Sequence, residues 1–141
     1  GEQFATKWEF RELIEEELMQ YARIDVCIVG GLTEARKVAN WCETHYIDIA
    51  PHNPLGPVST AACLHLDLTT SNFGVQELPR QPGTILPEVF PVQVSFEDGH
   101  LLPPTSPGLG IDFNEEAALA YYYQEGNSPR ISRPDGSFTN W

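Results

Sequence analysis

Hydrophobic residues near the start of the chain follow two different spacings. From Thr6 onward they recur at helical intervals with acidic residues between them, and Thr6 and Glu9 have the spacing of a capping box at a helix start. The apolar side of this predicted helix consists of Phe10, Leu13, Ile14, Leu18 and Tyr21. Residues 23–29 are then a short β-branched run closed by two glycines, which predicts a buried strand.

The alternation continues to residue 78. A second helix is predicted from Thr33, and a second short strand over residues 47–50. A helix of small residues over 58–66 and a third strand over 73–78 follow. Helices that alternate with strands through short connections are typical of an α/β fold with a parallel sheet.

The pattern changes after residue 78, where four prolines interrupt the chain. Glu97-Asp98-Gly99, between two short apolar runs, predicts a β-hairpin. Asn114 is placed to cap a short helix over 115–122, whose first-turn carboxylates suit the helix dipole. A polar tail rich in proline and glycine occupies residues 126–141.

Charge narrows the classes of function. The 141 residues carry a net charge of −12, which repels phosphate backbones and anionic lipid and so argues against nucleic-acid and membrane roles. No apolar run reaches the roughly 18 residues of a membrane span, and the N-terminus lacks a signal-peptide pattern. The three cysteines, Cys27, Cys42 and Cys63, fit neither a disulfide framework nor a zinc site, and we interpret them as buried reduced thiols of a cytoplasmic protein. An anionic substrate would need a local cation, for which a bound metal is the natural candidate.

Chemistry in parallel α/β folds concentrates at the carboxyl ends of strands. Asp25, His52 and Glu77 lie at or near such ends, and Glu2 lies just before the first helix. Strand alternation would turn Asp25 and Glu77 toward the inside of a barrel, where an acid needs a proton, a cation or a partner. Structural alternatives remain open from the residues alone: a capping role for His52, a buried structural carboxylate at Asp25, and solvated glutamates.

Several blocks of the chain resemble one family of enzymes. Residues 23–37 (RIDVCIVGGLTEARK), 50–57 (APHNPLGP) and 61–66 (AACLHL), with 105–111 (TSPGLGI) and the ending 133–141 (RPDGSFTNW), are similar to acid-sugar dehydratases of the enolase superfamily. The galactonate dehydratase family is the one they resemble best. The resemblance implies a modified TIM barrel with an α+β capping domain. It assigns residues 1–90 to the C-terminal part of the barrel, from strand five or six to strand eight, and residues 91–141 to a segment that contributes to the capping domain.

The same resemblance implies roles for the four candidate residues. Glu2 would be the third carboxylate ligand of Mg²⁺, at the end of strand five. Asp25 and His52 would be the dyad on strands six and seven, with His52 as the base. Glu77, at the end of strand eight, would hydrogen-bond the substrate carboxylate. The implied reaction is Mg²⁺-dependent dehydration of a galactonate-like aldonate to a 2-keto-3-deoxy acid through an enediolate.

Two features limit what the resemblance implies. The stretch after His52 (NPLGP) lacks the aspartate that mannonate-type dehydratases often carry, although mannonate-type dehydration and acid-sugar racemisation remain alternatives. The other metal carboxylates and the general acid of the family belong to strands that precede this chain. We therefore expect the chain alone to be inactive and to need the preceding part of the enzyme as its partner, in what is usually a homo-oligomer. A purely structural role is the alternative of a different class.

Overall fold

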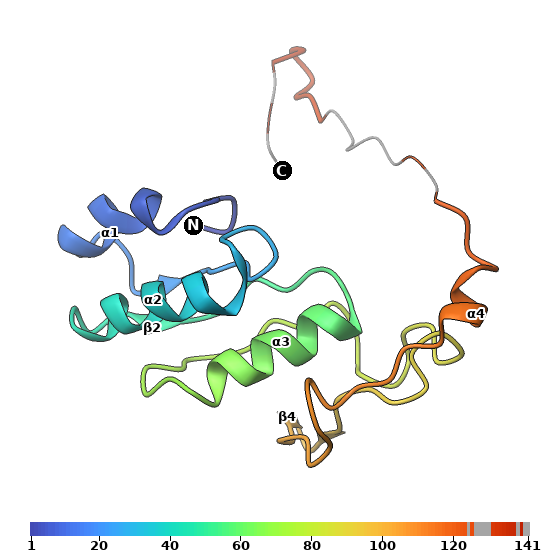
Figure 1. Ribbon diagram of the computed structural model, residues 1–141. Coiled ribbons are helices and arrows are strands. Elements are labelled where there is room, and N and C mark those ends of the chain that lie inside the picture. The colour runs from blue at the N-terminus through green and yellow to red at the C-terminus, as the bar shows by residue number, and fades with distance from the viewer. Residues whose placement is uncertain (124, 126–130, 138, 140–141) are drawn as a thin grey trace.

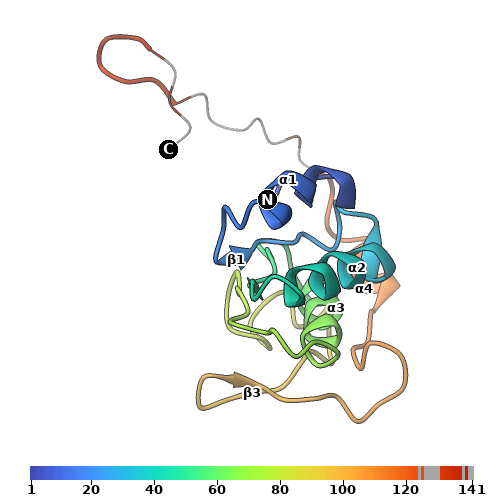
Figure 2. The same cartoon turned by 90° about the vertical axis from the view of Figure 1, so that its left-hand side faces the viewer.

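The computed structural model describes residues 1–123, 125, 131–137 and 139. The elements in chain order are η1 (Lys7–Phe10), α1 (Arg11–Glu15), β1 (Tyr21–Ala22), α2 (Gly31–Glu43), β2 (Asp48–Ile49), α3 (Pro57–Asp67), β3 (Phe96–Glu97), β4 (His100–Leu101) and α4 (Glu115–Ala118). Figures 1 and 2 show α2 and α3 packed side by side, with the short strands beside them. None of the helices in the described ranges is long and apolar enough to cross a membrane.

The parallel sheet predicted from the alternation is confirmed. β1 pairs with β2 in parallel, with Tyr21 opposite Asp48 and Ala22 opposite Ile49. The ladder continues past the assigned strands, because the His52 N–H donates to the Ile24 carbonyl at 2.9 Å. A parallel bridge joins Ile49 to Phe73 on the other side of β2. Three parallel segments therefore lie next to one another, and their carboxyl ends meet at one edge.

The core lies between the sheet and the helices. Phe10 and Ile14 from the first helices, Ile24 and Ile49 from the sheet, and one face of α2 are buried together. That face of α2 comprises Ala35, Val38, Ala39 and Cys42, as the helical spacing predicts. Burial of these apolar surfaces is the main source of stability for a chain of this size.

The first helix begins as predicted and ends earlier. The Thr6 N–H donates to the Glu9 carboxylate at 2.9 Å, which confirms the capping box. The helix ends at Glu15 because Glu17 adopts a left-handed conformation with φ of 53°, and the Leu18 N–H returns to the Leu13 carbonyl at 2.9 Å. This is the hydrogen-bonding pattern of a Schellman motif, which terminates helices. Leu18 and Tyr21 are consequently exposed, contrary to the helical face expected for them.

The strand predicted over residues 23–29 is misplaced: β1 lies ahead of it at Tyr21–Ala22, and backbone pairing continues only to Ile24. Asp25 starts a tight turn in which the Val29 N–H donates to the Asp25 carbonyl at 2.9 Å. The Asp25 carboxylate accepts from the Cys27 N–H at 2.8 Å, and this local bond competes with strand pairing. Asp25, Cys27 and Val29 therefore do not share a strand face.

The cysteine prediction is correct for two of the three thiols. Cys42 and Cys63 are free and buried, and burial raises the pKa of each thiol to about 12. Cys27 is free and exposed, because the turn after Asp25 carries it out of the sheet.

The third predicted strand is only a bridge at Phe73. The Gly74 N–H donates to the Ile49 carbonyl at 2.9 Å, and no strand is assigned to residues 75–78. Phe73 is 44% exposed and Val75 is 60% exposed. Within the described residues this side of the sheet is an open edge, as expected for part of a barrel.

The C-terminal part contains the predicted hairpin. β3 and β4 pair with Glu97 opposite His100. Asp98 and Gly99 form the two-residue turn with φ of 49° and 81°, the signs that a type I′ turn requires. The hairpin region packs on α3 through Val94 and Leu101.

The helix predicted over 115–122 is shorter than expected. The Asn114 side chain caps it by accepting from the Ala117 N–H at 3.1 Å, and the helix ends at Ala118. Of the tail predicted over 126–141, residues 131–137 and 139 are described, and the rest lie outside the described residues. The division of the chain at residue 90 stays a prediction.

Asp67 ends α3 with a buried carboxyl group that lacks a hydrogen-bond partner among the described residues. Burial raises its pKa to about 7 from an ordinary value of 3.8. Between these two values the folded chain holds a proton at Asp67 that the unfolded chain releases. The stability that Asp67 contributes therefore falls as the pH rises from about 4 to 7.

We expect Asp67→Asn to become progressively more stable than the wild type between pH 5 and pH 8, by on the order of 2 kcal/mol. The other titratable groups nearest the carboxyl, His100 and Cys63, remain in both proteins. Urea unfolding across this pH range measures the difference. The exposed Asp98→Asn is the matched control and should follow the wild-type curve. Parallel curves for Asp67→Asn and wild type would contradict the assignment.

Candidate functional site

The sheet brings His52 and Asp25 into contact. Each lies at the carboxyl end of its strand, and the backbone bond from His52 to Ile24 holds the two strand ends in register. The His52 Nδ1 atom lies 2.9 Å from the Asp25 Oδ2 atom. Asp25 is 3% exposed, and the His52 side chain is 18% exposed. The pair expected from the sequence is therefore formed, with its acid inside the protein and its imidazole partly open.

The surroundings of Asp25 fix the orientation of the imidazole. Asp25 Oδ1 accepts from the backbone N–H groups of Cys27 at 2.8 Å and Ile28 at 3.3 Å. These donors hold the carboxylate in place. An ionised carboxylate can only accept, so the His52 Nδ1 atom is the donor of the pair. The neutral ring then keeps a lone pair on Nε2.

Glu2 lies across the imidazole from Asp25. Its Oε2 atom is 3.7 Å from His52 Nε2 and 3.7 Å from Nη2 of Arg23. The structure therefore places Glu2 beside the free nitrogen of His52, although the two residues are far apart in the chain.

Glu77 is held by two donors rather than left in solvent. Its Oε2 atom accepts from Arg23 Nη2 at 2.6 Å and from the Asn53 N–H at 2.8 Å. Arg23 thus contacts Glu77 and approaches Glu2. Because Glu2 also approaches His52, which contacts Asp25, the four candidates from the sequence form one connected cluster.

Arg23 and Asn53 also belong to the cluster, although the sequence did not predict them as functional residues. A signal for Arg23 existed, because an extended backbone puts it on the same side as Asp25, two positions later. Asn53 is fully buried, and its amide donates to Thr60 at 2.9 Å and to the Glu77 carbonyl at 3.2 Å. It joins the end of β2 to α3 and to residue 77.

The metal chemistry of the cluster is incomplete within this chain. The Glu2 carboxylate is a hard oxygen ligand of the kind that Mg²⁺ prefers. Among the described residues, however, no group of three or more His, Cys, Asp or Glu side chains is arranged to hold a metal ion. Glu2 therefore fits as one ligand of a site whose other ligands lie elsewhere.

Comparison with known proteins identifies the relatives of this chain. Residues 1–117 match the family model described as enolase C-terminal domain-like. A D-mannonate dehydratase from Caulobacter sp. (strain K31) is 41% identical over 144 aligned positions, which cover all of this chain and 35% of the relative. A D-galactonate dehydratase family member from Streptomyces bingchenggensis is 39% identical over all of this chain and 34% of the relative. The chain thus spans about a third of the length of these relatives.

A solved structure agrees with the sequence relatives. An enolase from Pantoea ananatis with bound D-gluconate and Mg superposes with a TM-score of 0.89 at 35% identity, covering 98% of this chain and 34% of that one. Mannonate dehydratases occur among the relatives, together with members of the D-galactonate dehydratase family.

The family match, the relatives and the fold confirm the resemblance read from the sequence and the expected class of fold. The chain belongs to the enolase C-terminal domain-like family, and it corresponds to the C-terminal part of the modified TIM barrel of enolase-superfamily enzymes.

Proposed function

We propose that this chain carries the base of an acid-sugar dehydratase, which removes water from a six-carbon aldonate to give a 2-keto-3-deoxy acid. The contact of 2.9 Å between His52 and Asp25, at the carboxyl ends of adjacent parallel strands, is the observation that carries the proposal. Relatives named as mannonate and galactonate dehydratases, and a related structure with bound D-gluconate, support this class of substrate.

The first step in this proposal is the removal of the C2 proton by His52. The Nε2 lone pair accepts the proton while the C2–H electron pair moves into the carboxylate to form an enediolate. The imidazolium that results lies between two carboxylates, with Asp25 at 2.9 Å from Nδ1 and Glu2 at 3.7 Å from Nε2. Both stabilise its positive charge. Asp25 also keeps Nε2 free before the reaction, because it occupies Nδ1.

The second step removes the hydroxyl group from C3. The C3–O bond breaks as a proton reaches the departing oxygen, water leaves, and the enol product tautomerises to the 2-keto acid. The general acid that supplies this proton belongs to a part of the enzyme outside this chain. Mg²⁺, when bound with Glu2 as one ligand, would offset the second negative charge of the enediolate.

Because of Arg23, we propose a different role for Glu77 from the hydrogen bond to the substrate carboxylate that the resemblance implies. Two carboxylates repel each other unless a proton or a cation lies between them, so Glu77 is poorly suited to bind an ionised sugar acid directly. Arg23 lies beside Glu77 and provides a cation in a chain with a net charge of −12. In our proposal Arg23 pairs with the substrate carboxylate. Glu77 holds the guanidinium group in position, and the Asn53 N–H in turn holds the Glu77 carboxylate.

His52→Asn is expected to lower kcat on the complete enzyme by at least about a thousandfold, because the proton acceptor is lost. The assay uses Mg²⁺ with a panel that includes mannonate, galactonate and gluconate, and it detects 2-keto-3-deoxy products. Exchange of the C2 hydrogen with solvent deuterium should stop as well.

His45→Asn is the matched control for this substitution, since His45 lies outside the candidate site and the ion-pair partner of its ring among the described residues is Glu17, at 3.9 Å. Its activity should equal that of the wild type. Normal turnover in His52→Asn would refute the base assignment. Epimerised acids in place of keto acids would indicate racemisation, and inactivity of the wild type on the whole panel would favour a structural role.

Arg23→Gln should raise KM for the aldonate by about tenfold to a hundredfold, the loss expected for a charge-assisted hydrogen bond. Arg23→Lys should recover part of the loss, because it keeps the charge but not the planar geometry. Arg11→Gln is the control, since Arg11 pairs on the surface with Glu15. An unchanged KM in Arg23→Gln would show that another group binds the carboxylate.

Glu2→Gln should raise the Mg²⁺ concentration needed for half-maximal activity by about tenfold or more, because it removes a charged ligand. Titration of activity against Mg²⁺ and calorimetric Mg²⁺ binding both measure the change. The exposed Glu12→Gln should leave both curves unchanged. Equal Mg²⁺ affinity in Glu2→Gln would exclude Glu2 from the metal site.

A further inference from the structure

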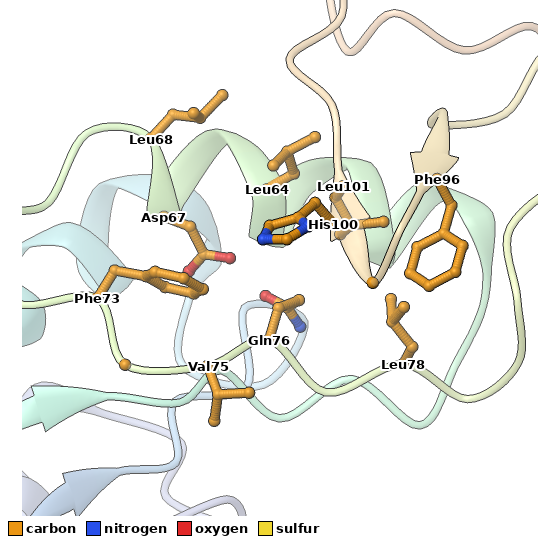
Figure 3. Close-up of a pocket in the computed structure, with 12 residues that line it drawn as sticks. Leu64, Asp67, Leu68, Phe73, Val75, Gln76, Leu78, Phe96, His100 and Leu101 are labelled. Atoms are coloured by element: carbon orange, nitrogen blue, oxygen red, sulfur yellow. The ribbon is translucent and has the colours of Figure 1, made fainter.

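A pocket lies apart from the candidate site (the His52 cluster of Glu2, Arg23, Asp25, His52, Asn53 and Glu77), between α3, residues 73–78 and the hairpin of β3 and β4. It has a volume of about 390 Å³. Figure 3 shows its walls, which are largely apolar and include Leu64, Phe73 and Phe96. None of the residues of the His52 cluster lines it.

Three polar groups converge in this pocket. Figure 3 shows the Asp67 carboxyl group and the Gln76 amide oxygen turned toward the same space, with the His100 ring beside them. Asp67 is 7% exposed, and neither of its carboxyl oxygens has a hydrogen-bond partner among the described residues. Gln76 Oε1 is also buried without such a partner, while its amide nitrogen donates to the Glu77 carbonyl at 2.7 Å.

All of these groups accept hydrogen bonds. His100 Nδ1 lies 2.8 Å from the Asp98 carbonyl and must donate to it, so Nε2 of the neutral ring is an acceptor. The lining contains no Lys or Arg side chain. Asp67 also stands at the C-terminal end of α3, where the helix dipole is negative. A buried acid with acceptors around it requires a donor, and a cationic donor satisfies it best.

We propose that this pocket binds an organic cation, an ammonium or guanidinium group carried on an apolar body. The Asp67 carboxylate pairs with the positive group, and the Gln76 oxygen and His100 Nε2 accept from its remaining N–H donors. The leucine and phenylalanine side chains cover the hydrocarbon part. The cation is either a free amine or the basic side chain of a polypeptide that covers the open edge beside residues 73–78.

A proton competes with the cation for Asp67. Burial raises the pKa of the carboxyl to about 7, so near neutral pH the empty pocket holds a mixture of the acid and its carboxylate. The protonated acid is uncharged, so it does not need a cation to offset a buried charge. Cation binding should therefore strengthen by about tenfold from pH 6 to pH 8.

The first arm of the test titrates the 141-residue chain with n-butylguanidinium, followed by calorimetry and by NMR of the pocket methyl groups. We expect saturable binding that weakens at least about tenfold in Asp67→Asn. The uncharged isostere n-butylurea should bind more weakly than the cation. Asp98→Asn makes the same chemical change at an exposed position of the adjacent hairpin, and it should bind like the wild type.

The second arm repeats the titration on the full-length gene product and identifies the source of the cation. Binding that Asp67→Asn weakens would indicate a free amine as the natural ligand. If the full-length product does not bind n-butylguanidinium, and if Asp67→Asn lowers its melting temperature, the natural cation is a basic side chain of the protein itself.

Three results would overturn the proposal. The first is equal binding of n-butylguanidinium to the wild-type chain and to Asp67→Asn. The second is the absence of saturable binding to the wild-type chain. The third is a full-length product that does not bind n-butylguanidinium and whose melting temperature Asp67→Asn does not lower. Asp67→Asn is nearly isosteric and removes a buried charge, so it should fold. Thermal unfolding of the variant checks this directly.

Discussion

One backbone hydrogen bond sets the geometry on which the candidate site depends. The N–H of His52 donates to the carbonyl of Ile24, and this extends the parallel ladder to the ends of both strands. A shift of one residue would turn the His52 side chain to the opposite face of the sheet, away from Asp25. The register is in turn held by buried side chains on the helix-covered face of the sheet, such as Ile24 and Ile49. Packing in the core therefore positions the imidazole relative to its acid.

Electrostatics around the site follow from the same arrangement. An acidic chain gathers three carboxylates, from Glu2, Asp25 and Glu77, at one edge of a sheet, where they would repel one another without positive partners. Asp25 is satisfied by backbone N–H groups and the imidazole, and Glu77 by Arg23 and a backbone N–H. Among the residues that the structure describes, Glu2 has only two ion-pair contacts, each at 3.7 Å. It is thus the carboxylate of the three with the most capacity left for an added cation.

The sequence predicted the parts of this structure that depend on local pattern. Helices α2 and α3, the parallel order of the strands and the hairpin turn at Asp98 and Gly99 all follow from spacing and turn chemistry. The pattern placed Asp25 and His52 at strand ends, and the resemblance to acid-sugar dehydratases implied that they form a pair. The predictions that failed concern features set by a competing side-chain hydrogen bond or by residues far away in the sequence. The Asp25 side chain diverts the strand into a turn, and the contact between Arg23 and Glu77 joins residues 54 positions apart. Residues 75–78 have strand-like composition, but strands form only against a neighbour.

The turn after Asp25 has a consequence for covalent labelling of the chain. The thiols of Cys42 and Cys63 are buried and stay protonated at neutral pH, and thiols react as thiolates. Cys27 is the thiol that solvent reaches, and its own backbone N–H holds the carboxylate that orients the imidazole. An alkylating fluorophore would thus attach selectively two residues from Asp25. Its emission would report on the order of this turn in the native chain.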